Sequence, residues 1–393
     1  MTLRIVQVCH DCVPTSGGTY TSAQDFRRAL GADVVSFTAA ALREQAPPDG
    51  GGVHHIFIDG GPLRRSYAWP GRDSPGLAAG EQRVARASML IVHGLFRYHA
   101  QWARALAHRY RIPYWLVPHG TLDPWVFSYR ALRKKAWLAL VGRHIVADAQ
   151  RVLHATPQEA AAAAAYIPSH VPASVIPWPV DPQPAEPGAG AAIRMRLGVA
   201  ADADVLLVLG RLHPSKGILE AIRAVGDIAE ARLHLLLVGP ETRALSSAEC
   251  RALGDRYAPG RVHLTGGVEN RQIKGYLAAS DALLSLSRRE NFGYAVAEAM
   301  AAGLPVIITP QVALASSLQG IECGWIMSER SGRAAHAALT AFLATSPTER
   351  ARLGANGRQF VERELSRERF ARRLRELLPL GSTQPTGGRD VHA

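Results

Sequence analysis

Short apolar runs alternate with helix-length segments along most of the 393 residues. Runs of this kind are typical of strands buried on both faces of a parallel sheet, because the crossover helices cover both faces. In the first half we expect strands at residues 3–8, 34–37, 55–58, 90–92, 114–117 and 152–154. Helices are expected between several of them, for example over residues 21–30, 96–108 and 131–141.

A stretch rich in proline and glycine interrupts this alternation. Residues 177–190 read PWPVDPQPAEPGAG, which predicts an extended linker, since proline fixes φ and removes a backbone donor. Strand patterns then begin again at residues 205–209, 233–238, 262–264, 282–286 and 306–308. We therefore predict an α/β protein with two Rossmann-like lobes, residues 1–176 and 191–380, that face a central cleft, and a disordered tail over 381–393.

Composition restricts the partners only weakly. The chain is 47% hydrophobic and 20% charged, as in an ordinary globular protein, and its formal net charge is +12. A basic surface suits nucleic acid, anionic lipid or phosphorylated small molecules. No basic platform interleaved with aromatic residues is apparent, so nucleic acid is not an expected partner. With neither a signal-peptide pattern nor a membrane-length apolar run, we expect a cytoplasmic protein or one peripheral to the inner face of the membrane.

Cys9 and Cys12 form a C-x-x-C pair that resembles half of a zinc site. A second Cys/His pair at suitable spacing is missing, and no thioredoxin-like context surrounds the motif. A buried pair at a strand end is the simpler interpretation. No D-x-D-type acidic pair that would demand a metal is apparent either, so we expect no metal and no other cofactor.

Two glutamates follow the expected strand at residues 282–286. The sequence RRENFGYAVAEAMAAGLPVI places Glu290 in a loop and Glu298 inside the next helix. Eight helical residues rise about 12 Å, so the two carboxylates suit opposite ends of an elongated ligand such as a nucleotide sugar. Between them, the backbone N–H groups of residues 291–294 open a helix whose N-terminus favours anions. Either glutamate alone would equally fit an ordinary loop or helix position.

Two cations lie on a glycine-flanked loop after the expected strand at residues 205–209. Arg211 and Lys216 are five residues apart in GRLHPSKG and can approach a diphosphate from two sides. A solvated loop with two basic residues is the alternative interpretation. Further along, the turn TGGVE around Val268 ends another strand and allows a flat ligand to approach the backbone.

The expected first lobe carries weaker signals at its strand ends. Gly17 and Gly18 open a helix, but they do not form a G-x-G-x-x-G, which argues against an NAD-binding lobe. His119 lies between Pro118 and Gly120, where a histidine is placed to face a cleft rather than serve only as a structural hydrogen bonder. His93 precedes a glycine at the end of another strand and is similarly placed.

Two segments beyond these loops give further predictions. Thr156 followed by Pro157 and Glu159 predicts a helix start closed by a capping box. The segment from Arg130 to Leu140 places basic residues beside tryptophan and leucine at helical spacing. It suits peripheral contact with an anionic membrane, or simply a helix with one solvated basic face.

The E-x7-E string, with Phe292-Gly293 after the first glutamate, resembles the signature of family 4 retaining glycosyltransferases of GT-B fold. The resemblance implies that Glu290 is catalytic and faces the donor sugar, beside Asn291, Phe292 and Gly293. Glu298 would bind the ribose. The GRLHPSKG loop resembles the family's diphosphate-binding loop, which assigns the diphosphate to Arg211 and Lys216. Val268 would seat the base.

The first lobe resembles the family more loosely. The loop PHGTLDPW resembles that of a bacterial polysaccharide subset, in which a histidine, here His119, approaches the donor sugar and joins the catalytic residues. Gly17 and Gly18 would face the cleft, and His93 would line the acceptor side.

The implied reaction transfers a sugar from a nucleotide diphosphate-sugar to an acceptor hydroxyl with retention and without a metal. The acceptor would be a lipid-linked or growing glycan in bacterial cell-surface polysaccharide synthesis. A GT-B-fold nucleotide-sugar epimerase, a phosphorylase and a non-catalytic nucleotide-sugar- or glycan-binding subunit remain as alternatives.

Overall fold

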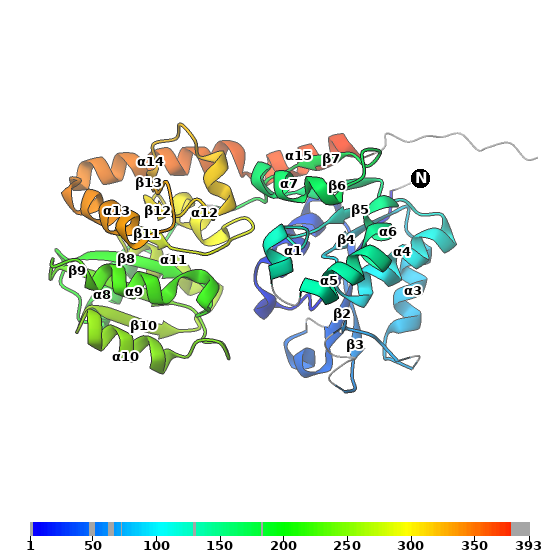
Figure 1. The fold of residues 1–393 in the computed structure, drawn as a ribbon, viewed down its shortest axis with the longest axis horizontal. Coiled ribbons are helices and arrows are strands. Elements are labelled where there is room, and N and C mark those ends of the chain that lie inside the picture. Colours follow the sequence, from blue (N-terminus) through cyan, green and yellow to red (C-terminus); the bar gives the residue numbers. More distant parts are fainter. Residues whose placement is uncertain are drawn as a thin grey trace, which may run out of the picture.

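The computed structural model describes residues 3–46, 52–61, 67–71, 73–128, 131–181 and 184–378. Within them the chain forms two α/β lobes, each built on one parallel sheet, as the sequence predicts (Figure 1). The tail over 381–393 lies outside the described residues, so its predicted disorder stays a prediction. Among the described helices, none is long and apolar enough to cross a membrane.

The described part of the first lobe carries a seven-stranded sheet in the order β3-β2-β1-β4-β5-β6-β7. Its strands are β1 (Ile5–His10), β2 (Asp33–Ala39), β3 (Val53–Ile58), β4 (Met89–His93), β5 (Tyr114–Val117), β6 (Arg151–His154) and β7 (Ala173–Val175). The helices that cover it are α1 (Gly18–Leu30), α3 (Leu77–Ala85), α4 (Tyr98–Tyr110), α5 (Ala131–Trp137), α6 (Arg143–Ala147) and α7 (Pro157–Ala163). Every residue of β4 and of β5 is buried, which is why these strands read as continuous apolar runs.

The described part of the second lobe carries a six-stranded sheet in the order β10-β9-β8-β11-β12-β13. Its strands are β8 (Asp204–Leu209), β9 (Leu233–Val238), β10 (Val262–Gly266), β11 (Ala282–Ser285), β12 (Val306–Ile308) and β13 (Gly324–Ile326). Its helices are α8 (Ala189–Arg196), α9 (Ile218–Gly226), α10 (Ser247–Tyr257), α11 (Asn270–Ala278), α12 (Tyr294–Ala301), α13 (Gly332–Ala344) and α14 (Pro347–Glu364).

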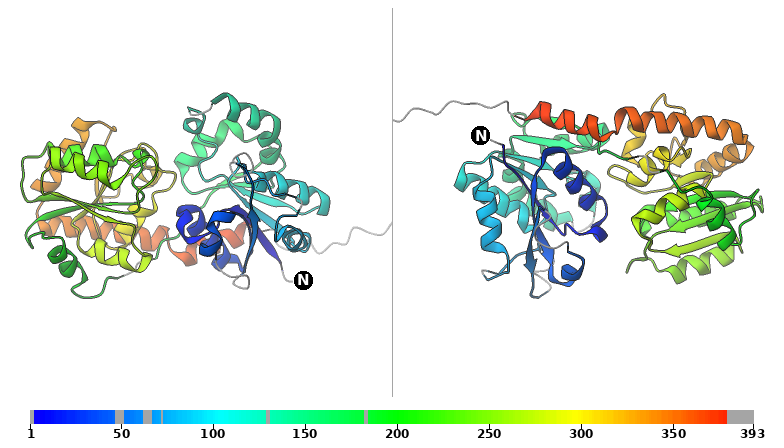
Figure 2. Two further views of the ribbon diagram at one scale, coloured as in Figure 1. Left: turned by 90° about the horizontal axis from the view of Figure 1, so that it is seen from below. Right: turned by 180° about the vertical axis from the view of Figure 1, so that it is seen from behind.

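The last described helix, α15 (Arg367–Leu377), packs against the first lobe, although the predicted second lobe of 191–380 includes it (Figures 1 and 2). The ring of Phe370 lies edge-on to Phe26 of α1 at 5.2 Å. Arg367 pairs with the buried carboxylate of Asp25 at 3.1 Å. The chain therefore crosses between the lobes twice, once through the proline-rich segment and once between α14 and α15.

Two strands, β7 and β13, were not predicted from the sequence. β7 and β13 are three residues long, lie at sheet edges and are only partly buried, so neither produces a continuous apolar run. Cys9 and Cys12 are free thiols buried at the end of β1. A hydrogen bond between them and burial raise the pKa of Cys9 well above its usual value, which fits the structural interpretation of this pair.

Candidate functional site

The loop after β8 brings Lys216 to the loop after β11. It turns through a single 3-10 turn, Pro214–Lys216, and enters α9 at Gly217, whose φ is +70°. A Cβ at Gly217 would lie 2.1 Å from the carbonyl oxygen of Leu286, so only glycine permits this close approach. The two loops, in which Lys216 and Glu290 are 74 residues apart in sequence, thereby meet at the carboxyl-terminal ends of the central strands β8 and β11.

Lys216 and Glu290 form an ion pair at these strand ends, with both side chains partly exposed. The backbone of Glu290 is held on both sides: its N–H donates to the carbonyl of Gln311 at 3.0 Å, and its carbonyl accepts from Ala313 at 2.9 Å. The segment after β12 thus fixes the backbone of Glu290. Arg211, on the same loop as Lys216, is exposed.

The residues after Glu290 divide into ligand-facing and core positions. Gly293 has φ +101° and caps the N-terminus of α12. Asn291 is partly exposed, whereas the side chain of Phe292 is 2% exposed and belongs to a hydrophobic core cluster that includes residues of both lobes. Phe292 was predicted to contact the donor sugar, and its burial leaves only its backbone for that contact.

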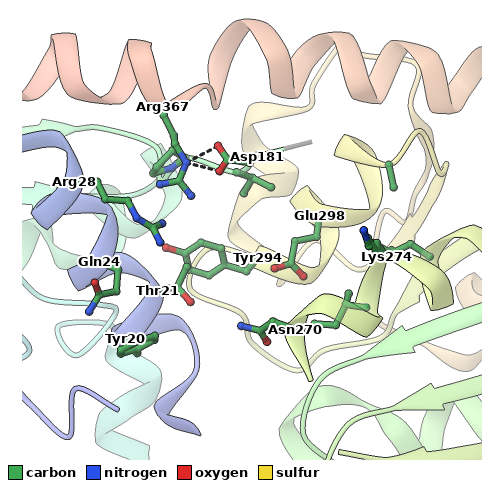
Figure 3. A pocket seen from close by; sticks show the side chains of 15 residues that line it. Tyr20, Thr21, Gln24, Arg28, Asp181, Asn270, Lys274, Tyr294, Glu298 and Arg367 are labelled. Carbon is green, nitrogen blue, oxygen red and sulfur yellow. Dashed lines mark hydrogen bonds and ion pairs between the residues drawn. The ribbon is translucent and has the colours of Figure 1, made fainter. Parts of the chain in front are cut away.

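Glu298 lines a pocket of about 250 Å³ between the two lobes. Its carboxylate points into the space between Tyr294 and Asn270, and Arg28 approaches from the first lobe (Figure 3). Burial raises the pKa of Glu298 to about 7, because a charged carboxylate is poorly solvated there.

Val268 lies between β10 and α11, is partly buried and packs against the hydrophobic core cluster that includes residues of both lobes. Gly239, after β9, donates to the carbonyl of Gly266 at 3.0 Å and so ties this turn to the neighbouring strand end. Backbone groups around Val268 therefore lie at the carboxyl-terminal ends of the strands of the second sheet, as the Lys216 loop does.

His119 heads a hydrogen-bonded chain inside the first lobe. Its Nε2 lies 2.9 Å from Nδ1 of His93, and Nε2 of His93 lies 2.8 Å from Oε1 of Gln7. The amide nitrogen of Gln7 donates to the carbonyl of Ala23 at 3.1 Å, which turns Oε1 toward His93. His93 must then carry its proton on Nε2 and accept from His119, leaving Nδ1 of His119 as an acceptor.

Burial keeps both histidines neutral. It lowers the pKa of His119 to about 4, and that of His93 well below its usual value with a further contribution from His119. His93 was predicted to line the acceptor side, but it is 1% exposed and both ring nitrogens are engaged. Its Nδ1 instead accepts the hydrogen bond from Nε2 of His119 and so holds the orientation of that ring.

Gly17 and Gly18 lie at the edge of the cleft. Gly17 has φ +68° and is exposed, with no atom within 4 Å of the position of a Cβ. A Cβ at Gly18 would lie 3.4 Å from the ring of Tyr294 in the second lobe. The first turn of α1 thus faces the helix that carries Glu298.

Sequence reasoning missed the role of Glu159. Thr156 caps α7 as predicted, since its side chain accepts from the backbone N–H of Glu159. The carboxylate of Glu159 does not close the capping box on Thr156. It accepts from the N–H groups of Ala155 at 2.8 Å and Gly120 at 2.6 Å, and so holds the loop of His119. The capping motif predicts where the helix begins, but it does not predict that the Glu159 carboxylate accepts a hydrogen bond from Gly120, 39 residues earlier.

The predicted basic helix is present over its described part, Ala131–Trp137, and continues through the π-helical turn Leu138–Gly142 into α6. Leu132 is 86% exposed and Leu140 is 72% exposed. Among the described residues, no group of three or more His, Cys, Asp or Glu side chains is arranged to hold a metal ion.

Both lobes match models of glycosyltransferase families. Residues 17–179 match the glycosyl transferase 4-like domain, and residues 191–360 match the glycosyl transferases group 1. Together with the two facing parallel-sheet lobes, these matches define a glycosyltransferase of GT-B fold. The chain belongs to glycosyltransferase family 4.

Curated relatives match parts of the chain. The D-inositol 3-phosphate glycosyltransferase of Xylanimonas cellulosilytica is 31% identical over 140 residues, 34% of each chain. The lipopolysaccharide glucosyltransferase WaaG of Escherichia coli is 29% identical over 139 residues, 35% of this chain and 36% of WaaG. The putative colanic acid biosynthesis glycosyltransferase WcaL of Escherichia coli is 28% identical over 184 residues, 44% of each. Each alignment spans less than half of the relative's length.

Solved structures match across both lobes. Sucrose-phosphate synthase from Thermosynechococcus elongatus has a TM-score of 0.75 at 22% identity, covering 95% of this chain and 98% of that one. Anabaena Alr3699/HepE, solved in complex with UDP-glucose, has a TM-score of 0.74 at 19% identity, with the same coverage. At these identities the likeness shows the GT-B fold.

Proposed function

We propose that this family 4 enzyme is a retaining glycosyltransferase that takes a sugar from a nucleotide diphosphate-sugar. The observation that carries the proposal is the Lys216–Glu290 ion pair on the second lobe, with Glu298 in the pocket between the lobes and His119 on the loop after β5 of the first lobe. Relatives named as glycosyltransferases of bacterial surface glycans, and a structural neighbour solved with UDP-glucose, support this donor class.

In this proposal the donor lies along the carboxyl-terminal ends of the strands of the second sheet. The base sits on the backbone around Val268, and the ribose hydroxyls donate to Glu298. Lys216 and Arg211 neutralise the diphosphate, which draws Lys216 away from Glu290 and frees that carboxylate for the sugar hydroxyls. Asn291 and the backbone of Phe292 and Gly293 complete the sugar site.

His119 contributes from the first lobe. Its neutral ring offers Nδ1 as an acceptor for a sugar hydroxyl, and the Gln7–His93 chain behind it fixes that tautomer. The cations that bind the diphosphate also stabilise the charge that develops as the nucleoside diphosphate departs. The acceptor hydroxyl attacks from the same face, and the departing phosphate takes its proton, so the anomeric configuration is retained without a metal.

The proposed acceptor is a lipid-linked or growing glycan of a bacterial cell surface. The support is the exposed Leu132 and Leu140 on a helix that also carries Arg133, Lys135 and Arg143. Such a surface suits contact with an anionic membrane where a lipid-linked acceptor would lie.

Glu290→Ala and Lys216→Ala test the catalytic assignment. Each variant should lower nucleoside diphosphate release from the best of a set of UDP-, GDP- and ADP-sugars by at least about 100-fold, because each removes a charged group at the reacting centre. The melting temperature should stay within a few degrees of the wild type. Glu329→Ala, which removes an exposed carboxylate of the same lobe, is the control and should keep full turnover. Near-normal turnover in either site variant would overturn the assignment.

A further inference from the structure

A buried carboxylate of the first lobe lies at the contact between the two lobes. Glu159 is 5% exposed and accepts hydrogen bonds from the backbone N–H groups of Ala155 and Gly120. The side chain of Asn291, from the second lobe, also hydrogen-bonds to this carboxylate. A single side chain thus joins the loop of His119 to the loop of Glu290.

Arg289 makes the complementary contacts from the second lobe. Its guanidinium donates to the carbonyl of Gly120 at 2.8 Å and pairs with Asp123 at 3.0 Å. It also lies over the ring of Trp125 at 5.5 Å. We call Glu159, Gly120, Asp123, Arg289 and Asn291 the inter-lobe contact.

The inter-lobe contact is tightly packed at Gly120. This residue has φ +71°, and a Cβ there would lie 2.4 Å from Oδ1 of Asn291 and 2.8 Å from Nη2 of Arg289. His119 immediately precedes it with φ +52°, a conformation that non-glycine residues adopt only when their surroundings impose it. The hydrogen bond from Gly120 to Glu159 is therefore part of what holds the His119 backbone in place.

We propose that Glu159 is a positioning residue that, together with Arg289, fixes the His119 loop against the Glu290 loop. His119 and Glu290 adjoin this contact directly, one residue from Gly120 and from Asn291 respectively. Aligning the two on one donor sugar requires a fixed relation between loops of separate lobes, and the inter-lobe contact supplies it. The catalytic benefit rests on the proposed donor site; the mechanical coupling between the loops does not.

Hydrogen exchange measured by mass spectrometry tests the coupling without any substrate. In Glu159→Gln one acceptor oxygen becomes a donor that faces backbone N–H groups. We expect amide exchange to rise about tenfold in residues 118–124 and also across the cleft in residues 289–293. Arg289→Ala should produce the reciprocal effect in residues 118–124. Glu44→Gln, at an exposed carboxylate of the first lobe, is the control and should change neither segment.

Exchange that rises only in the lobe carrying the substitution would overturn the coupling. Should Glu159→Gln fail to fold, Arg289→Ala decides alone, because it leaves the two backbone hydrogen bonds of Glu159 intact. With the nucleotide sugar that binds best, we expect both variants to lower kcat about tenfold and to change the Kd of the matching nucleoside diphosphate less than twofold. An unchanged kcat would overturn the positioning role, whereas failure of the wild type to bind any nucleotide sugar would overturn the proposed function and leave the exchange result standing.

Discussion

At the scale of single residues, burial sets the ionisation of the side chains proposed to hold the donor. His119 has a pKa of about 4 and stays neutral, so it acts through a lone pair rather than a charge. Glu298 has a pKa of about 7 and changes charge close to neutral pH. The two residues should therefore respond differently to pH, and of the two it is Glu298 that should change its charge near neutrality.

This gives a prediction for nucleotide-sugar affinity. In the proposed site the ribose hydroxyls donate to the charged carboxylate, so binding should lower the pKa of Glu298 and release a proton whenever Glu298 starts protonated. We expect affinity to weaken about tenfold between about pH 8 and about pH 6. Isothermal titration with a nucleotide sugar measures this cleanly, because its diphosphate has no ionisation near pH 7. Glu298→Gln should bind more weakly with a flat pH profile; an unchanged slope in that variant would refute the assignment.

At the scale of elements, the sequence was informative where one element carries its own signal. Glu290 and Glu298 belong to a single loop and helix, and their spacing suits the two ends of an elongated ligand. Lys216 and Gly217 were likewise local to one loop. The role of Glu159 could not be predicted, because its partner Gly120 lies 39 residues away in sequence and its partner Asn291 lies on the other lobe. The place of His93 behind His119 likewise depends on the pairing of strands, which local pattern does not reveal.

The docking of α15 on α1 should contribute to stability in a pH-dependent manner. Burial raises the pKa of Asp25 to about 7, and the charge of Arg367 opposes that rise. Without Arg367 the pKa rises further, so the folded state is penalised most at high pH, where an unfolded aspartate is charged. We expect Arg367→Ala to lower the free energy of unfolding by about 1–3 kcal/mol at about pH 8, and by less at about pH 6.

Denaturant unfolding of Arg367→Ala at the two pH values measures this difference. The matched control is Arg372→Ala on the same helix, which removes an exposed i,i+4 pair with Glu376 and should cost less than about 0.5 kcal/mol. An equal loss for Arg367→Ala at both pH values would show that Asp25 is not the group that Arg367 stabilises.

The helix that begins at Ala131 gives a separate prediction. If its exposed leucines enter a membrane surface, Leu140→Glu should lower sedimentation with vesicles rich in phosphatidylglycerol about tenfold, since it removes apolar area and adds a negative charge. Neutral phosphatidylcholine vesicles should bind the wild type weakly. Met195→Glu, at an 80% exposed site on α8 of the second lobe, is the control. Equal binding by all three proteins would exclude this helix as the membrane contact.

At the scale of the whole molecule, the two-lobed architecture followed from the sequence because each lobe repeats the same strand and helix alternation around a proline-rich break. The arrangement of the two lobes relative to each other could not be predicted from the sequence, because it depends on side chains that meet across the cleft. α15 shows the same limit: the sequence places it in the predicted second lobe of 191–380, and nothing local in it indicates that it packs on the first lobe. The proposed site is built from that arrangement, with the donor loops on one lobe and His119 on the other.

The central claim is that the second lobe binds a nucleotide diphosphate-sugar at Lys216 and Glu290, beyond the ends of strands β8 and β11. Thermal unfolding of the wild type and of Lys216→Ala, each with a panel of UDP-, GDP- and ADP-sugars, tests it most directly. A ligand that binds only the folded state raises the melting temperature with its occupancy. We expect sugars of one base to raise the melting temperature of the wild type by several degrees and Lys216→Ala to lose most of this shift. No shift with any donor, or an equal shift in Lys216→Ala, would contradict it.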